Sequence, residues 1–310
     1  MPVVLHENES VSDDYQLVQL ANGRQTLFSA SYGEKMHPGL GPQAEAEWLY
    51  VRQLRICERL QAQDGEFVIW DVGLGGAANA ITALQAAREI SGRLRLVSFD
   101  NTDEPLAFAL KHSAALGYPV GYEEQIASLL RNHRAEFTIG KLEVNWEFHQ
   151  GDFPGWLAQT AARETSGQIA SLENVPSPHA IFYDAFSPAK NPAMWTLPLF
   201  ENLFRRTDPQ RPCGLTTYSR STLLRVTLLL AGFFVGVGHA TGMKEETTVA
   251  ANTLDLIDEP LDARWLERAL RSDSAEPLRQ PVYSRAALAP ATADQLRRHP
   301  QFGARRKNEE

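Results

Sequence analysis

The sequence predicts an α/β protein built around a doubly wound, mostly parallel β-sheet. Short apolar runs, of the kind expected for parallel strands buried on both faces, recur through the chain at residues 67–70, 94–99, 146–149, 180–183 and 214–218. Segments with helical periodicity follow the first two runs, at residues 78–90 and 105–116. Because strands that alternate with helices form βαβ units, we expect a parallel sheet with helices on both of its faces.

The regions on either side of these units complete a division into three parts. We expect an N-terminal extension and flap over residues 1–63, a core over 64–255, and a C-terminal helical and basic tail packed on the core over 256–310. In the extension, residues 26–30 alternate like a strand, and residues 43–60 have the spacing of an amphipathic helix.

Three more local features can be assigned. Residues 160–173 look like a loop insertion before the strand at 180–183. Short helices are expected at 263–270 and 291–298, the second capped by Thr292.

Composition is that of a globular, soluble protein. The 310 residues are 43% hydrophobic and 22% charged, so the chain can bury a sizeable core. No apolar run reaches the roughly 18 residues of a membrane span, because Arg225 and Gly232 interrupt the longest one. Residues 1–14 are polar and acidic, so we expect no secretory signal. With only Cys57 and Cys213, the chain has neither a disulfide framework nor metal-ligand spacing. These features favour a cytoplasmic protein without a metal.

The charge balance limits the possible partners. A formal net charge of −8 argues against a wholly basic nucleic-acid binder, although a local basic patch remains compatible with it. Basic residues gather at 297–299 and 305–307. They form either a solvated tail or a contact for RNA.

A glycine turn at residues 71–76, Asp-Val-Gly-Leu-Gly-Gly, follows the first strand and opens a helix. Glycines there let the backbone bend sharply and approach a ligand, and the helix N-terminus offers free N–H groups. The dinucleotide pattern G-x-G-x-x-G fails because Ala78 stands at its last glycine position. A phosphate-binding P-loop is excluded because no Gly-Lys-Ser/Thr follows.

Acidic residues accompany three consecutive strands. Asp71 comes just before the first glycine, Asp100 stands at the end of the second strand, and Asp152 follows the third. An acid in the position of Asp100 can accept hydrogen bonds from both hydroxyls of a ribose. We therefore expect the three carboxylates to line one edge of the sheet, where ligands bind, unless Asp100 and Asp152 merely cap the helices that follow.

Three segments together resemble the MnmC-like methyltransferases, which modify the wobble uridine of tRNA. Residues 184–195 match the family segment D-x-F-[SA]-P-x-K-N-P-x-[LM]-W, and residues 31–38 with Glu45 and Glu47 are similar to its G-E-x-x-H-S…E stretch. Residues 225–244 resemble its V-R…A-G-F…G-x-K-R-E ending. The resemblance covers about residues 13 to 285.

The chain departs from the family pattern in places. In the glycine turn, Gly73, Gly75 and Asn79 match, whereas Ala77 replaces the third glycine. The closing K-R-E becomes Lys244-Glu245-Glu246, with the loss of one positive charge.

The resemblance implies a Rossmann-like fold, S-adenosyl-L-methionine as cofactor, and the primary amine of 5-aminomethyl(-2-thio)uridine in tRNA as methyl acceptor. In some bacteria this domain is fused to a flavin-dependent oxidase; we expect a standalone methyltransferase domain without FAD here.

The resemblance also implies a set of site residues. The methionine end of the cofactor is expected at Asp71, Gly73, Gly75 and Asn79, the ribose at Asp100, and the adenine amino group at Asp152. Substrate contacts are expected from Phe186, Pro188, Lys190 and Lys244. A flap over the site is expected from Tyr32, Glu34 and His37, with Tyr32 and Glu34 among the residues that bind the cofactor.

Methyl transfer to an amine places one clear demand on the protein. The leaving group is neutral, so the enzyme has to align the reactants and supply a free amine lone pair. Asp184, at a strand end and inside a Phe-Ser-Pro loop, suits the role of proton acceptor. Phe186 is a candidate for stacking on a flipped base, whereas Trp195 is expected in the core. His37 is not assigned a catalytic role.

Two other functions remain open from the residues. The three aspartates permit a methyltransferase or aminopropyltransferase-like enzyme that acts on a small-molecule amine, which the acidic surface favours. A nucleotide-binding protein without catalysis is the other. A hydrolase is disfavoured because Ser219 and Ser221 lack the glycines of a nucleophile elbow.

Overall fold

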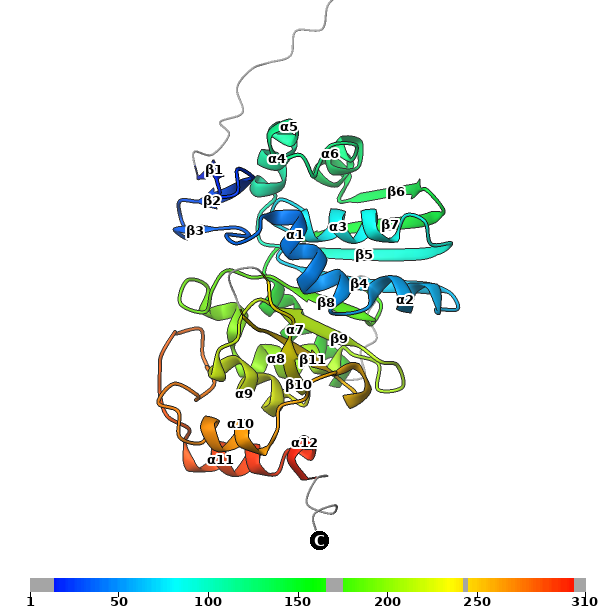
Figure 1. Cartoon of the computed structure of the whole chain (residues 1–310). Helices are drawn as coiled ribbons and strands as arrows, with labels where there is room; N and C mark the ends of the chain where they lie inside the picture. Colours follow the sequence, from blue (N-terminus) through cyan, green and yellow to red (C-terminus); the bar gives the residue numbers. More distant parts are fainter. Residues whose placement is uncertain (1–13, 166–174, 242–244, 304–310) are drawn as a thin grey trace, which may run out of the picture.

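The structure, a computed structural model, describes residues 14–165, 175–241 and 245–303. An eight-stranded sheet forms its centre, in the order β10-β11-β9-β8-β4-β5-β7-β6 (Figure 1). The strands are β4 (Glu66–Val72), β5 (Gly92–Asp100), β6 (Arg134–Ile139), β7 (Leu142–Gln150), β8 (Ala180–Tyr183), β9 (Gly214–Thr217), β10 (Phe234–Gly238) and β11 (Thr247–Ala251).

The five central strands run parallel, and the predicted fold class is confirmed. β7, β5, β4, β8 and β9 pair in parallel, whereas β6 at one edge and the β11–β10 pair at the other are antiparallel additions. From β4 the chain moves outward to β5 and β7 and then returns to β8 on the other side. The switch point of this Rossmann-like sheet therefore lies at β4 and β8, where ligands bind outside the strand ends.

Two hydrophobic clusters cover the two faces of the sheet. Alternate residues of β4 explain how, because Phe67 and Ile69 join one cluster and Val68, Trp70 and Val72 join the other. The first face carries α1 (Pro42–Ala46), η1 (Glu47–Arg52), α2 (Ile56–Gln61), α3 (Ala78–Ala87), α4 (Glu104–Lys111), α5 (Ser113–Leu116) and α6 (Glu123–Asn132). The second carries α7 (Phe153–Thr165), α8 (Leu197–Arg205) and α9 (Thr222–Ala231).

A small antiparallel sheet precedes this core in the chain. It consists of β1 (Tyr15–Gln19), β2 (Gln25–Ser29) and β3 (Glu34–Lys35). The strand expected at 26–30 is β2, whereas β1 and β3 were not expected. Tyr15 and Leu27 pack in the same cluster as α3, so the small sheet lies against the first face of the core.

The single helix expected at 43–60 is wrong. The segment forms α1, the π-helix η1 and α2, with Arg55 in the left-handed conformation (φ 49°) before α2. The break lets both ends bury apolar side chains, Leu49 and Tyr50 on η1 and Ile56 and Leu60 on α2. Burial in the core has overridden the simple helical period.

Other elements differ from expectation in detail. The helix at 105–116 is interrupted at His112, which separates α4 from α5. The loop insertion at 160–173 is wrong up to Thr165, because α7 continues to that residue; the remainder lies outside the described residues. The sequence reasoning missed the antiparallel strands β6, β10 and β11 and the helices α6, α8 and α9. A signal existed for some of them, because β6 alternates polar and apolar residues and α6 and α8 are amphipathic.

The C-terminal part contains short elements: η2 (Pro192–Trp195) belongs to the core, and η3 (Leu254–Leu256), α10 (Ala263–Ala269), α11 (Pro290–Arg297) and α12 (Pro300–Gly303) follow β11. The cap expected at Thr292 is wrong, because Ala289 is the N-cap of α11 and the Thr292 hydroxyl donates to Glu276 instead (2.9 Å).

The division of the chain into an extension, a core and a tail stays a prediction. Among the described residues, no helix is long and apolar enough to span a membrane.

Candidate active site

The loops after β4, β5, β7 and β8 surround a cavity of about 750 Å³. Residues 32–38 of the N-terminal sheet cover it from the opposite side. Eight of the site residues predicted from the sequence line this cavity: Tyr32, Glu34, Gly73, Gly75, Asp100, Asp152, Asp184 and Phe186. His37, predicted in the flap, lines it too.

The glycine turn brings the β4 and β8 loops close together. Gly73 has a φ of 96°, and a Cβ built on it would lie 2.6 Å from the Asp184 carbonyl oxygen. Gly75 has a φ of 50° and donates its N–H to Asp100 Oδ2 (2.8 Å). Only glycine satisfies both the left-handed backbone and the close approach at position 73.

Asp100 ends β5 with its carboxylate at the cavity. Oδ2 accepts from Gly75 and Oδ1 from the Asn101 N–H (2.8 Å), and the Thr102 N–H is a third backbone donor to the carboxylate, which still leaves acceptor capacity for a ligand. Burial raises the pKa of Asp100 to about 6, against the lowering effect of these backbone donors.

Asp71 lies one layer behind the cavity, and the expectation that it follows its strand is wrong. It is inside β4, fully buried, and opposite Ser98 of β5 in the strand register. The Ser98 hydroxyl donates to Asp71 Oδ2 (3.0 Å). Burial, with the Asp184 and Asp100 carboxylates nearby, raises the pKa of Asp71 to about 8.

Asp184 is held at the end of β8 by polar neighbours. Its N–H donates to the Val72 carbonyl (2.9 Å), and its Oδ2 accepts from Asn79 Nδ2 (2.8 Å). His37 Nε2 lies 3.8 Å from the same oxygen. Burial, and then the charge of Asp184, raise the pKa of the Tyr50 and Tyr218 hydroxyls. Asn79 does not line the cavity, so its hydrogen bond holds the Asp184 carboxylate from the side away from the cavity.

The flap and the loop after β8 are joined by direct contacts. The Tyr32 and Phe186 rings stack with centroids 3.9 Å apart and planes at 13°. The Ser187 N–H donates to Glu34 Oε2 (3.2 Å), and the Ser187 hydroxyl donates to Glu34 Oε1.

The core side of the same loop is fixed as well. Trp195 is fully buried, as expected, and donates its Nε1–H to the Phe186 carbonyl (2.7 Å). The Tyr218 hydroxyl donates to the Ala185 carbonyl (2.9 Å).

The remaining predicted substrate residues are not among those that line the cavity. Pro188 and Lys190 do not line it; Lys190 is exposed, and its Nζ lies beside the lining residue Gly33. Lys244 lies outside the described residues.

Several lining residues were missed by the sequence reasoning: Met36, Glu45, Leu49, Asn101, Phe153, Asn191, Met194 and Tyr218. Glu45, Asn191 and Met194 belong to the motifs that carried the resemblance, so a signal for them existed. Tyr218 follows β9, and the rule that ligands bind at the carboxyl ends of parallel strands identifies that position.

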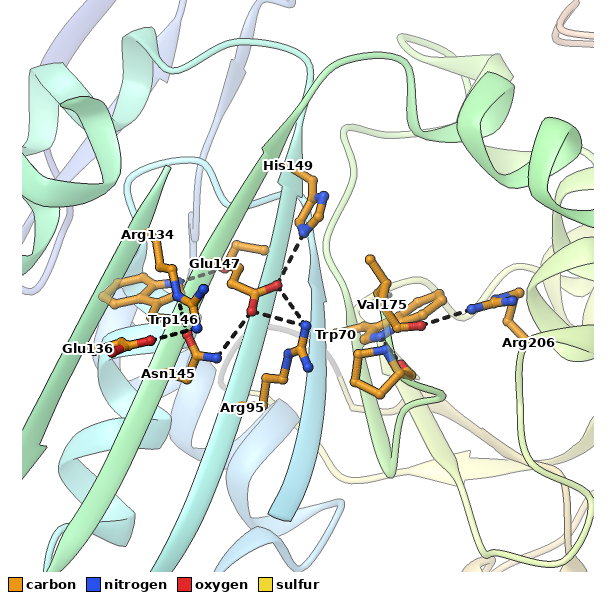
Figure 2. A network of polar contacts seen from close by, with 12 residues as sticks. Trp70, Arg95, Arg134, Glu136, Asn145, Trp146, Glu147, His149, Val175 and Arg206 are labelled. Carbon is orange, nitrogen blue, oxygen red and sulfur yellow. Dashed lines mark hydrogen bonds and ion pairs between the residues drawn. The ribbon is translucent and has the colours of Figure 1, made fainter. Parts of the chain in front are cut away.

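A second cavity of about 680 Å³ adjoins the first and shares Phe99, Gly151, Asp152 and Phe153 with it. Figure 2 shows its polar network, in which Glu147 accepts from Arg95 and lies 3.5 Å from His149. Burial acts to raise the pKa of Glu147, but the hydrogen bonds from His149 and Arg95 hold it at about 2. The network ties β5 to β7 beside the candidate adenine site.

Among the described residues, no group of three or more His, Cys, Asp or Glu side chains is arranged to hold a metal ion.

Known proteins resemble this chain in sequence and in fold. Residues 158–253 match the model of a family described as S-adenosyl-L-methionine-dependent methyltransferase. The chain is 31% identical over 275 residues to the tRNA 5-methylaminomethyl-2-thiouridine biosynthesis bifunctional protein MnmC of Ectopseudomonas mendocina, covering 84% of this chain and 38% of that protein. It is 28% identical over 234 residues to the protein of the same name from Aeromonas hydrophila, covering 71% and 33%. The chain thus spans little more than a third of these relatives.

The solved structure of MNMC2 from Aquifex aeolicus agrees with the whole fold. It superposes with a TM-score of 0.65 at 25% identity, covering 91% of this chain and 84% of that one. Sheet, glycine turn and family match together define an S-adenosyl-L-methionine-dependent methyltransferase. The resemblance to the MnmC-like methyltransferases, first seen in the motif around Asp184, is confirmed.

Proposed function

We propose that this methyltransferase acts on the primary amine of 5-aminomethyl(-2-thio)uridine at the wobble position of tRNA. The observation that carries the proposal is the convergence of Asp184, Phe186 and the flap residues Tyr32 and Glu34 on one cavity beside the glycine turn. The proteins named MnmC, and the MNMC2 structure that matches 91% of the chain, support it.

The residues present fit S-adenosyl-L-methionine. Asp100 offers two carboxylate oxygens with lone pairs to spare for ribose hydroxyls. Asn79 Oδ1, a buried acceptor beside Asp184, has no hydrogen-bond partner among the described residues, so it could accept from an ammonium group. Asp71 Oδ1 also lacks a partner, but Asp71 is sealed behind the residues that line the cavity. Gly73 and Gly75 allow close backbone approach at the methionine end, and Asp152 is available to the adenine amino group.

Chemistry at this site requires positioning and one proton acceptor. When bound, S-adenosyl-L-methionine supplies a methyl group on a sulfonium whose leaving group is neutral. Asp184 accepts a proton from the substrate ammonium and so exposes the nitrogen lone pair. Asn79 holds the accepting carboxylate, and the Tyr32–Phe186 pair presents an aromatic surface beside it.

The charges around the cavity favour a cationic acceptor. Glu34, Glu45, Asp100, Asp152 and Asp184 line it, and Lys35 is the only lysine or arginine among the lining residues that the structure describes. A protonated amine is attracted by this field, whereas phosphates are repelled. We therefore expect the aminomethyl group to enter and the tRNA backbone to remain outside.

Nucleosides from cells that lack the gene test the proposal. Mass spectrometry of total tRNA should show accumulated 5-aminomethyluridine derivatives, and purified protein with labelled cofactor should methylate that tRNA. An unmodified transcript is the control. Normal nucleoside levels, together with no transfer to the accumulated tRNA, contradict the proposal.

A small-molecule amine is the second candidate acceptor, and the five carboxylates of the cavity favour it. Putrescine and spermidine offered in the same assay, and again with decarboxylated S-adenosylmethionine as aminopropyl donor, distinguish the two. Methylation of these amines in the first assay, or aminopropylation in the second, without transfer to tRNA replaces the first proposal.

Replacement of Asp184 by Asn tests whether the protein is catalytic. The variant retains an oxygen that can accept from Asn79 but loses the proton acceptor, so we expect unchanged cofactor affinity in calorimetry and methyl transfer reduced about 100-fold or more. Wild-type turnover in this variant would remove Asp184 from the mechanism. Cofactor binding without methyl transfer in the wild-type chain instead indicates a non-catalytic binding protein.

A further inference from the structure

His37 has an unusual backbone at the edge of the cavity. Its φ of 53° places a non-glycine residue in the left-handed region, a conformation that costs about 1–2 kcal/mol. The preceding residue holds it there, because Met36 donates its N–H to Leu27 (2.8 Å) and accepts from the Thr26 hydroxyl. Such strain persists where the surrounding structure enforces it, often at functional sites.

The side chain of His37 points at the carboxylate of Asp184. Its Nε2 lies 3.8 Å from Asp184 Oδ2, and the side chain is only 13% exposed. Other charged or titratable groups lining the same cavity come from β3 (Glu34 and Lys35), α1 (Glu45), the strand ends (Asp100, Asp152 and Tyr218) and Tyr32.

Resting on the proposed function, we propose that His37 is a positioning residue that relays the substrate proton from Asp184 to solvent. In each turnover an ammonium N–H bond breaks, its electron pair stays on nitrogen, and the proton goes to Asp184. The nitrogen then forms a bond to the methyl carbon as the carbon–sulfur bond breaks, with that pair left on sulfur. One proton has to leave Asp184 before the next cycle.

The neighbours of Asp184 single out the imidazole for this step. Asn79 reaches the carboxylate through an amide N–H, which donates and cannot take a proton. The Tyr218 hydroxyl is already donating to a carbonyl. The Tyr50 hydroxyl also contacts Asp184, but burial raises its pKa, so it keeps its own proton and takes no second one. Among the described side chains beside Asp184, the His37 imidazole, with Nε2 3.8 Å from Oδ2, is therefore the one that can take the proton.

Replacement of His37 by Gly tests the relay. Glycine accepts the left-handed backbone without strain and leaves room for an added base. We expect cofactor affinity within about twofold of wild type, kcat lowered about tenfold or more, and recovery of kcat as free-base imidazole is added. His37→Gln should be equally slow and should not respond to imidazole.

His133→Gly is the matched control, because His133 has a φ of 56° and does not line the first cavity. It should keep wild-type rates with and without imidazole. With an active wild-type chain, an unchanged kcat in His37→Gly, or a loss that imidazole does not restore, overturns the relay alone. Absence of transfer to the tRNA amine by the wild-type chain overturns the proposed function, and the relay with it.

Discussion

The carboxylates near the cavity differ in the atoms that surround them. Asp71 is sealed inside the sheet with one hydroxyl donor, Asp100 meets three backbone N–H groups at the cavity, and Asp184 faces an amide and an imidazole. The same side chain therefore stands in three environments, and we propose a ribose acceptor at Asp100 and a proton acceptor at Asp184. Burial and hydrogen bonding set these differences.

At the scale of single residues, we expect Asp100 to make cofactor affinity depend on pH. Because burial raises its pKa to about 6, the carboxylate proposed to accept the ribose hydroxyls is mostly protonated at pH 5. We expect the Kd for S-adenosyl-L-methionine to rise about tenfold between pH 7.5 and pH 5, measured by calorimetry. Asp100→Asn should bind weakly at both pH values, and an equally steep pH dependence in this variant would contradict the assignment.

Asp71 should make the folded protein less stable at high pH. With its pKa raised to about 8 from an ordinary value of 3.8, the folded state keeps a proton that the unfolded chain releases. The stability that this proton contributes is present at low pH and is lost as pH rises through 8, by roughly 3 kcal/mol between pH 5 and pH 8.

Denaturant unfolding of Asp71→Asn at both pH values measures this effect. The variant should lose most of the pH dependence, whereas Asp64→Asn, at an exposed position, should keep the wild-type slope. Equal slopes in wild type and Asp71→Asn would show that Asp71 is ionised in the folded protein.

At the scale of elements, the site depends on how closely two loops approach. Gly73 lets the turn after β4 pass against the backbone of Asp184, and the contacts between flap and loop hold Phe186 from the other side. We expect a change at this crossing to displace Asp184, the proposed proton acceptor, as well as the glycine turn.

A comparison of Gly73→Ala with Gly23→Ala separates two costs in unfolding free energy: the strain of a left-handed backbone and the clash of an added Cβ with the Asp184 backbone. Both glycines have positive φ, but a Cβ at Gly23 meets nothing within 4 Å. We expect Gly23→Ala to cost about 1 kcal/mol in unfolding free energy and Gly73→Ala at least about 2 kcal/mol, with loss of cofactor binding. Similar costs for the two variants, with binding intact, would mean that the crossing is not tight.

At the scale of the whole molecule, the C-terminal elements close one edge of the sheet. The Gln301 side chain accepts from the Val235 N–H (2.8 Å) and donates to the carbonyls of Val235 (2.7 Å) and Leu261 (2.8 Å). The backbone of edge strand β10 is thereby satisfied by a residue of α12.

Gln301→Ala should destabilise the fold without touching the chemistry. It leaves buried backbone groups unpaired, so we expect a loss of about 2 kcal/mol and a lower Tm, with kcat unchanged at 25 °C. Gln280→Ala, at an exposed position, is the control and should leave Tm unchanged. An unaltered Tm in Gln301→Ala would show that the C-terminal elements are not part of the cooperative fold.

Much of this organisation follows from local sequence. The parallel strands are apolar because both of their faces are buried, and that burial makes β4, β5, β8 and β9 visible as short runs. The edge strand β6 alternates polar and apolar residues, which is a strand signal that the sequence reasoning did not use. The break at Arg55 arises from packing of α2, which no local period encodes.

The chain order of residues was enough to indicate an α/β sheet, a methyltransferase motif and a cluster of carboxylates at strand ends, because these depend on short-range patterns. Only the tertiary structure decided which carboxylates reach the cavity, because Asp71 is buried inside β4. It also decided that His37 approaches Asp184, 147 positions later in the sequence, because the flap lies over the loop after β8. Contacts of this kind arise from packing between distant segments, and short-range patterns carry no record of them.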